Sequence, residues 1–392
     1  MYRGTLKIGI DLLWLRPKKV GGTETYIRNL LKGLQTVDEE NKYYLFISQS
    51  TKDSFDFVNS PNFHKIVCKV NNENRLLRII YTNFVLPWKI RKLNLDIMFF
   101  PTYMRPFLKM REYSISNIHD LQYLHYPENF SYFRRLVFKI FYSVSIRKSD
   151  KIIAISNFVK QDIMMHFGKE LSNLEYKINV IYNPIEFKNI QVEKYAEEVL
   201  AKWNLRKNEF IYTVSSMFPH KNLNTLVKAF AMLRVKNPGI KLVVSGISGP
   251  SRKEFTNILS DLSLADEVII TGYISDLERD TLYANCKCFV FPSVFEGFGM
   301  PPVEALWFGV PTIVSDIPVM REVTQNKAIY VSDYKNPDEW FKILADIFKG
   351  ENRYIISERA KKELYEAFSI ENIAREYLLL FKACKEEEML WR

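Results

Sequence analysis

The chain has 392 residues, of which 47% are hydrophobic and 26% are charged. This balance is that of a folded globular protein, so it excludes an intrinsically disordered chain, and the length predicts two or three domains. The 55 lysines and arginines against 45 acidic residues give a net charge of +10. A basic chain favours an anionic partner, without choosing among a phosphorylated ligand, an anionic membrane surface and a nucleic acid.

The sequence shows no pattern of a secretory or membrane-spanning segment. The N-terminal residues form a strand-like start without the apolar core and cleavage site of a signal peptide, and the apolar stretches are shorter than the about 20 residues that span a bilayer. The four cysteines form no CxxC pair, and the five histidines match no zinc-binding pattern. We therefore expect a cytoplasmic protein with reduced cysteines and no metal.

The first half of the chain alternates strand-like and helical patterns. After the first apolar run, a loop with two glycines leads into a segment whose Tyr26, Ile27, Leu30 and Leu34 share one helical face. This alternation predicts a parallel sheet in a domain at 1–186. Its strands are expected at 6–11, 43–47, 96–100, 115–118, 151–155 and 178–181.

The same order of strand, loop and helix starts again after a charged run that is expected to hold the interdomain linker, 187–207. A second doubly wound domain is predicted at 208–368, and two such sheets in tandem leave a cleft between them. A helical pattern within 369–392 closes the chain and could pack on either domain, including a return to the first. The strands of the second domain are expected at 210–214, 241–245, 268–271, 288–292 and 311–314.

The most informative segment follows the predicted strand at 288–292. It carries two glutamates, Glu296 and Glu304, separated by seven residues. Glu296 and the neighbouring glycines fall in the loop at the carboxyl end of a strand, where open α/β sheets bind ligands. The prolines then start a short helix, which is expected to hold Glu304 in its first turn. A glutamate near a helix start beside a glycine turn also has a purely structural explanation.

The whole segment, an EGFG run at Glu296 and a PPxEA run around Glu304, resembles the signature of retaining, nucleotide-sugar-dependent glycosyltransferases of family 4. The resemblance implies the α/β GT-B architecture, in which two Rossmann-like domains face a central cleft. It also implies that Glu304 accepts hydrogen bonds from the ribose of the donor. Glu296, with the backbone of Phe298, Gly299 and Met300, would hold the transferred sugar.

A second match lies in the loop after the strand at 210–214. The loop ends in Lys221, and the helix that follows would present free amides to a diphosphate, whose developing charge Lys221 would stabilise. An exposed lysine before a helix is the structural alternative. Many relatives add an arginine near this lysine, whereas this chain does not. Further donor-binding candidates at predicted strand ends are Gly246, Gly272 and Tyr273.

The first domain carries two further matches. Gly21, Gly22 and Glu24 resemble the family's GGxE loop, which lies against the diphosphate and the acceptor, although a tight turn would also explain the glycines. His119 and Asp120 resemble its HDL segment. His119 is expected to contact the donor sugar or the acceptor, and it joins Lys221 and Glu296 as a catalytic candidate. Asp120 either orients it or caps a local turn, and Glu24 is an acceptor-binding or orienting candidate.

The resemblance implies transfer of a hexose from a nucleotide sugar, with GDP-mannose favoured, to a lipid-linked or saccharide acceptor in surface polysaccharide, lipopolysaccharide or glycoconjugate synthesis. No cofactor and no metal are expected. The alternatives are a non-catalytic sugar-nucleotide-binding protein and an epimerase or phosphorylase on a similar frame. Basic aromatic stretches at 75–78, 88–92 and 133–142 are either solvated helix faces or sites of peripheral attachment to the inner face of the membrane. No motif for nucleic-acid binding accompanies the charge.

Overall fold

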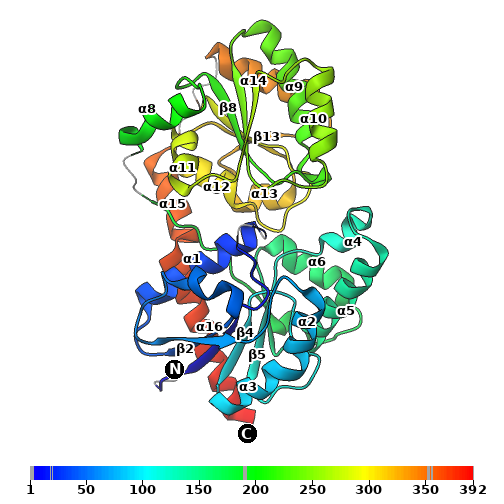
Figure 1. The fold of residues 1–392 in the computed structure, drawn as a ribbon, viewed down its shortest axis with the longest axis vertical. Coiled ribbons are helices and arrows are strands. Elements are labelled where there is room, and N and C mark those ends of the chain that lie inside the picture. Colours follow the sequence, from blue (N-terminus) through cyan, green and yellow to red (C-terminus); the bar gives the residue numbers. More distant parts are fainter. Residues whose placement is uncertain are drawn as a thin grey trace. The chain divides into compact units, whose positions relative to one another are not determined.

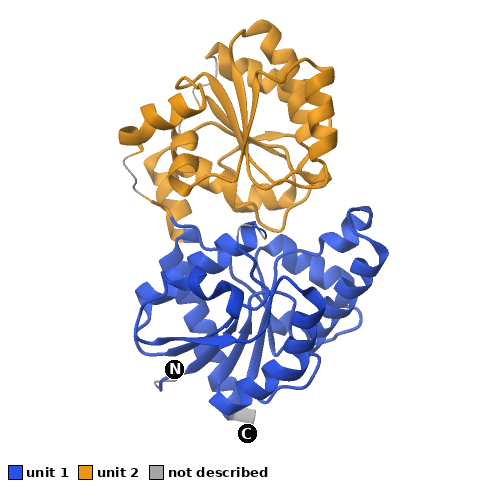
Figure 2. Ribbon diagram, in the orientation of Figure 1, with its two compact units in different colours: residues 1–186, 367–392 blue, residues 187–366 orange. Residues whose placement is uncertain are grey.

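The computed structural model describes residues 4–17, 19, 21–188, 192–350, 354 and 356–391. Two compact units make up the chain (Figure 2): Met1–Glu186 with Ala367–Arg392, and Phe187–Glu366. Each unit is a parallel β-sheet with helices packed on its faces (Figure 1). The two-unit α/β architecture of doubly wound sheets is therefore confirmed.

The first unit contains a seven-stranded sheet in the order β3-β2-β1-β4-β5-β6-β7, with every neighbouring pair parallel. The strand order reverses direction between β1 and β4, which places a topological switch point there. The strands are β1 (Lys7–Asp11), β2 (Lys42–Ser48), β3 (Phe63–Cys68), β4 (Ile97–Phe100), β5 (Tyr113–Ile118), β6 (Lys151–Ala154) and β7 (Ile178–Val180).

Helices connect these strands and cover the sheet, as parallel strands require crossover connections. The described helices are α1 (Gly22–Val37), α2 (Arg75–Ile80), α3 (Leu86–Leu93), α4 (Gln122–His125), α5 (Tyr132–Lys148), α6 (Asn157–Phe167), α7 (Leu174–Lys177) and α16 (Ile370–Trp391), with the shorter turns η1 (Gln49–Phe55), η2 (Tyr81–Val85) and η3 (Pro127–Asn129).

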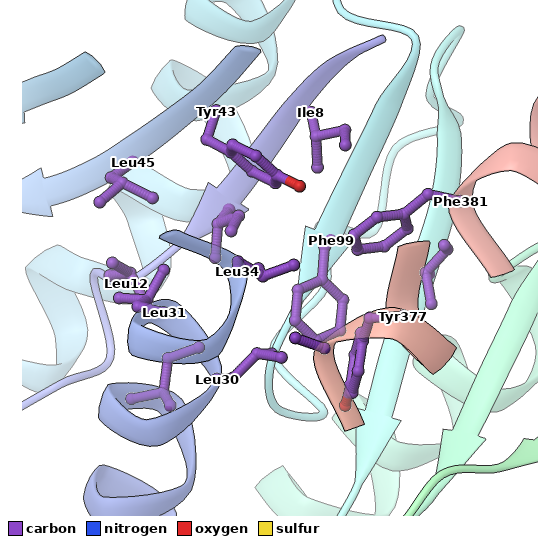
Figure 3. Packing of buried hydrophobic residues seen from close by; sticks show 14 of the residues in the cluster. Ile8, Leu12, Leu30, Leu31, Leu34, Tyr43, Leu45, Phe99, Tyr377 and Phe381 are labelled. Carbon is purple, nitrogen blue, oxygen red and sulfur yellow. The ribbon is translucent and has the colours of Figure 1, made fainter. Parts of the chain in front are cut away.

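The terminal helix α16 completes the core of the first unit. It packs along α1 and reaches β4 and β5, and Figure 3 shows Tyr377 and Phe381 beside Phe99. The aromatic rings of Phe99 and Tyr377 meet edge to face, with centroids 5.5 Å apart. The hydroxyls of Tyr26 and Tyr377, both fully buried, are hydrogen-bonded at 2.6 Å. The sequence left open which domain receives this helix, and the structure assigns it to the first.

The second unit contains a six-stranded parallel sheet in the order β10-β9-β8-β11-β12-β13, which reverses between β8 and β11. The strands are β8 (Phe210–Val214), β9 (Lys241–Ser245), β10 (Val268–Gly272), β11 (Cys288–Phe291), β12 (Thr312–Ser315) and β13 (Ile329–Val331). The described helices are α8 (Glu193–Lys202), η4 (Pro219–Lys221), α9 (Leu223–Lys236), α10 (Arg252–Asp261), α11 (Asp276–Asn285), α12 (Met300–Trp307), α13 (Pro318–Val323), α14 (Pro337–Lys349) and α15 (Glu358–Phe368), whose last residues enter the first unit.

The predicted strands are all present within two residues of their expected bounds, but two strands were missed. Strand β3 alternates buried and polar positions, including His64 and Lys65, and lies at the edge of its sheet. Strand β13 has only 3 residues. The predicted linker is also corrected, because 187–207 contains helix α8, whose Val199 and Leu200 are buried in the second unit. Its residues 189–191 lie outside the described part of the chain.

The close approach of α1 and α16 depends on Gly33. A Cβ atom at this position would overlap the backbone carbonyl of Ile370. We expect Gly33→Ala to lower the melting temperature, because an overpacking cost of about 1–3 kcal/mol exceeds the helix propensity gain of about 1 kcal/mol. Thermal unfolding followed by circular dichroism tests this. Thr36→Ala, at an exposed position of the same helix, is the control. A stabilised Gly33→Ala variant would contradict the packing described here.

Candidate functional site

The switch point of the second unit gathers two of the predicted residues. The loops 215–222 and 292–299 leave the carboxyl ends of the adjacent strands β8 and β11, where open α/β sheets bind ligands. The backbone amide of Val294 donates a hydrogen bond of 2.8 Å to the carbonyl of His220 and so ties the loops together. Because of this contact, Lys221 and Glu296 lie side by side although they come from different crossovers.

Lys221 and Glu296 form a short ion pair. The Lys221 Nζ atom lies 2.5 Å from Glu296 Oε1, and the two side chains are only 15% and 13% exposed. The hydroxyl of Ser293 donates a second hydrogen bond of 2.6 Å to the same oxygen. Low exposure strengthens the attraction, so the ammonium is held near the strand ends, where it can meet a phosphate. The sequence analysis did not predict a role for Ser293, although this residue stands three positions before Glu296.

Glu304 occupies a separate position on α12. Its Oε2 atom accepts a 3.0 Å hydrogen bond from the Tyr283 hydroxyl and lies 4.0 Å from Arg279 Nε. The sequence predicted Glu304 in the first helical turn. The helix begins at Met300, however, so Glu304 lies in the second turn, and its partners on α11 hold it rather than the helix N-terminus. Within the described residues both contacts use Oε2, which leaves Oε1 to accept hydrogen bonds from a ligand.

Arg279 and Tyr283 are functional candidates that sequence reasoning missed. They stand four residues apart on one face of α11, a spacing that could have grouped them, although neither belongs to a recognised motif. Burial, together with the Glu304 charge, raises the pKa of Tyr283 well above its usual value. Burial alone would lower the pKa of Arg279, but the charges of Glu304 and Asp280 raise it well above normal. Both groups therefore stay protonated, so Tyr283 presents a hydrogen-bond donor and Arg279 a positive charge to the Glu304 carboxylate.

The predicted glycines lie at the ends of neighbouring strands. The Gly246 amide donates to the Gly272 carbonyl at 2.9 Å, and a Cβ atom at Gly246 would overlap the Ser215 carbonyl oxygen, so only glycine fits there. Tyr273 follows with 62% of its surface exposed. The remaining donor candidates surround the start of α12: Phe298 and Met300 are buried, and Gly299 caps the helix with φ 96°. The side chains of Phe298 and Met300 thus serve the core, which leaves the backbone for ligand contact.

His119 follows β5 in the first unit. Its Nε2 atom lies 2.9 Å from the carbonyl of Pro101, and its ring packs edge-on against Tyr26 at 4.9 Å between centroids. Burial lowers the pKa of His119 to about 4, and the contact with Pro101 offsets only part of this effect. The ring is therefore neutral at physiological pH. A proton on Nε2 that bonds the carbonyl leaves Nδ1 as a hydrogen-bond acceptor.

The other predicted residues of the first unit make local contacts. The Asp120 carboxylate accepts a 2.9 Å hydrogen bond from the Gln122 amide, so it stabilises the turn into α4, while the contact with Pro101 positions the His119 ring. Glu24 forms an ion pair with Arg28, one turn along α1, at 2.9 Å. Gly21, with φ 59°, precedes α1, and Gly22 is the first residue of that helix.

One set of potential metal ligands was found among the described residues, although none was predicted. The ligand atoms of His125, Asp162 and His166 in the first unit lie within 4.8 Å of one another. They form hydrogen bonds: His125 Nε2 lies 2.8 Å from Asp162 Oδ1, and His166 Nδ1 lies 2.9 Å from the Asp162 carbonyl. A ring nitrogen that donates to oxygen cannot also bind a cation, so a metal would have to replace these hydrogen bonds.

The chain has two doubly wound units, and one of them carries an ion pair at its strand ends and a second carboxylate on α12. This is the architecture of the GT-B class of glycosyltransferases. Comparison with family profiles agrees. The profile described as Glycosyltransferase Family 4 matches residues 20–188, and that described as Glycosyl transferases group 1 matches residues 196–363. Together they cover most of the chain. The chain belongs to glycosyltransferase family 4.

Two of the curated relatives that the chain matches are named as O-antigen chain mannosyltransferases. The chain is 29% identical to the O-antigen chain mannosyltransferase RfbU of Salmonella typhimurium over 57% of its own length and 56% of the relative's. It is 24% identical to O-antigen chain mannosyltransferase B of Escherichia coli over 81% and 84%. The chain spans only 56% to 62% of the length of three of the curated relatives that it matches.

Solved structures share the fold. Sucrose-phosphate synthase from Thermosynechococcus elongatus aligns with a TM-score of 0.76 at 17% identity, over 96% of this chain and 98% of that one. Anabaena Alr3699/HepE in complex with UDP and glucose aligns with a TM-score of 0.73 at 17% identity, over 96% and 100%. No described helix is both long and apolar enough to cross a membrane.

The neutral state of His119 leads to a prediction about pH. Because its pKa of about 4 lies below the usual value, the ring gains a proton only as the pH falls through 4, and it stays neutral across the working range. We expect His119→Asn to lower kcat while leaving the shape of the pH–rate profile between about pH 5 and 8 unchanged. Steady-state rates of both proteins test this. An acid limb near pH 6.5 that disappears in the variant would contradict it.

Proposed function

We propose that this protein is a retaining hexosyltransferase that moves a sugar from a nucleoside diphosphate to a lipid-linked or saccharide acceptor in surface polysaccharide synthesis. The observation that carries the proposal is the Lys221–Glu296 ion pair at the switch point of the second unit. In the transition state the departing diphosphate carries negative charge and the sugar carries positive charge. The Lys221 ammonium suits the diphosphate, and the Glu296 carboxylate suits the sugar. The names of the mannosyltransferase relatives support GDP-mannose as the donor.

The second unit would bind the donor. Glu304, oriented by Tyr283 and Arg279, would offer a carboxylate oxygen to the ribose diol. Such preorganisation lowers the entropy cost of binding. The diphosphate would lie against Lys221 and the backbone before α9, and the strand ends at Gly246 and Gly272 would approach the base.

Catalysis would depend on charge redistribution. The bond between the anomeric carbon and the diphosphate oxygen breaks, and both electrons leave with the diphosphate. The acceptor oxygen forms the new bond on the same face of the sugar and gives up its proton to the departing diphosphate oxygen. Lys221 would exchange its carboxylate partner for the departing phosphate, which stabilises the negative charge that develops there. Glu296 would then accept a hydrogen bond from the transferred sugar, and neutral His119 would accept one from a sugar or acceptor hydroxyl.

We propose that the protein acts while it is attached to the membrane surface. Large exposed apolar side chains occur on α2, η2, α3 and α5 of the first unit, among them Leu76, Phe84, Trp88 and Phe133, which are 58% to 74% exposed. Lysines and arginines stand between them in the sequence. Apolar side chains interleaved with basic ones favour peripheral attachment to an anionic leaflet, here the inner face of the cell membrane.

Turnover should need no divalent cation, because Lys221 and backbone amides can carry the phosphate charge. With the nucleotide sugar and an acceptor, we expect release of nucleoside diphosphate that depends on the acceptor and proceeds at the same rate in EDTA. A coupled assay for nucleoside diphosphate measures this. Loss of activity in EDTA that magnesium or manganese restores would refute the metal-free mechanism. Binding of the donor without any release would instead identify a sugar-nucleotide-binding protein.

The two glutamates should fail in different ways. We expect Glu304→Gln to weaken nucleoside diphosphate binding roughly tenfold or more, because hydrogen bonds to a charged acceptor are worth about 1.5–3 kcal/mol. Glu296→Gln should change that affinity less than about threefold and lower kcat, because its contact is with the transferred sugar. Calorimetry and steady-state kinetics measure the two effects. Glu322→Gln, a glutamate on α13 outside the proposed site, is the control. Equal losses of nucleotide affinity in both variants would refute these roles.

A further inference from the structure

Four arginines from three separate segments of the first unit interact through their charges. Arg16 lies in the loop after β1, Arg75 and Arg78 lie on α2, and Arg134 lies in the first turn of α5. Burial, together with the positive charges of Arg16 and Arg75, lowers the pKa of both Arg78 and Arg134 from its usual value. The Arg78 and Arg134 guanidinium groups are thus each repelled by the charges of Arg16 and Arg75.

Hydrogen-bonding capacity in this cluster is unused. Arg78 is 8% exposed, and within the described residues its side chain forms one hydrogen bond, from Nη1 to the Trp14 carbonyl at 3.3 Å. The Nε atoms of Arg16 and Arg78 are buried and, within the described residues, have no hydrogen-bond partner. Burying an unsatisfied donor of a charged group costs free energy, and like charges add to that cost. The arginine cluster therefore lowers the free energy of unfolding of the protein without a ligand.

The acidic groups that face the cluster neutralise it only in part. Burial raises the pKa of Asp11 to about 7, against the opposing effects of the Leu13 amide and the Arg78 charge. Glu73 forms an ion pair with Lys19 at 2.9 Å, and this contact lowers the pKa of Glu73, with smaller contributions from the charges of Arg16 and Arg78. Tyr103 also faces the cluster, and burial raises its pKa to about 12. In the described part of the chain, none of the four arginines forms an ion pair with a carboxylate.

Exposed apolar residues adjoin two of these arginines in the sequence. Leu76 and Leu77, which follow Arg75, are 67% and 52% exposed, and Tyr132 and Phe133, which precede Arg134, are 76% and 74% exposed. The Arg134 guanidinium itself lies 5.0 Å from the centre of the Phe130 ring. A matching ligand would carry a compact anionic group whose oxygens accept hydrogen bonds from the guanidinium groups. It would also carry an apolar portion next to that group, which contacts the exposed apolar side chains.

We propose that Arg16, Arg75, Arg78 and Arg134 bind the diphosphate of a lipid-linked acceptor, and that the exposed apolar residues of α2 and α5 contact its hydrocarbon chain. Planar guanidinium groups donate paired hydrogen bonds that match phosphate oxygens, and the diphosphate supplies the negative charge that the cluster lacks. The inference rests on the proposed function, which it deepens by naming the acceptor class. The cluster belongs to the first unit, whereas the donor candidates Lys221, Glu296 and Glu304 belong to the second.

Binding of farnesyl diphosphate to the full chain, measured by calorimetry at physiological salt, tests the proposal. We expect the double variant Arg16→Gln/Arg134→Gln to weaken this binding about tenfold or more, since the loss of one charged hydrogen bond already lowers an affinity by about tenfold. Both substitutions fall on side chains that are not fully buried, so the fold should survive. Arg111→Gln, which removes an exposed arginine of the same unit outside the cluster, should change the affinity less than about twofold.

Comparison ligands separate the sources of the anion. Farnesol and inorganic pyrophosphate should each bind at least about tenfold more weakly than farnesyl diphosphate, because each lacks one of the two recognised parts. Saturating GDP or UDP should not displace farnesyl diphosphate, and neither should glycerol phosphate, the soluble headgroup part of phosphatidylglycerol. Displacement by nucleotide would assign the cluster to the donor, and displacement by glycerol phosphate would assign it to membrane headgroups. Either result, or equal loss in Arg111→Gln, overturns the proposal.

This test is independent of turnover. If farnesyl diphosphate binds as expected but no sugar is transferred to any lipid diphosphate, the transferase assignment fails while the arginine site stands. If sugar is transferred to a saccharide acceptor while farnesyl diphosphate does not bind, the arginine site fails and the transferase assignment stands.

Discussion

The common direction of the strands is the constraint on which the candidate sites depend. Because all paired strands of both sheets are parallel, every strand in a sheet ends at the same edge, and every following loop begins there. The reversal of strand order between β8 and β11 then separates two neighbouring crossovers. Lys221 and Glu296, far apart in the chain, can meet only because both loops start at this point. Their ion pair is thus a consequence of topology as well as of charge.

Much of this arrangement could be predicted from the sequence. Continuous apolar runs identify strands buried on both faces, and most strand bounds were close to those observed. Family motifs then marked Lys221, Glu296 and Glu304, because a motif places its residues on a known frame. The start of α12 was the weak point: the prolines pointed to a later first turn, whereas Gly299, with its positive φ, lets the helix begin at Met300.

The features that escaped prediction depend on distances that a linear pattern does not contain. Arg279 and Tyr283 matter only because α11 lies beside α12, which brings both of them to Glu304. The guanidinium groups of Arg16 and Arg134 come from segments with no shared motif, and their mutual repulsion arises only in the folded unit. Short edge strands such as β13 lack the length that makes a pattern visible.

The return of the last helix to the first unit sets an order for events at the ribosome. The early residues of the chain can form their sheet as soon as β7 has emerged, but Tyr377 and Phe381 are still to be translated, and the side of α1 that they cover stays open to water. The intervening unit is synthesised and released from the exit tunnel in the meantime. The unit that begins the chain is therefore the last to be completed, and a nascent chain that stalls before α16 presents an apolar surface for chaperones to recognise.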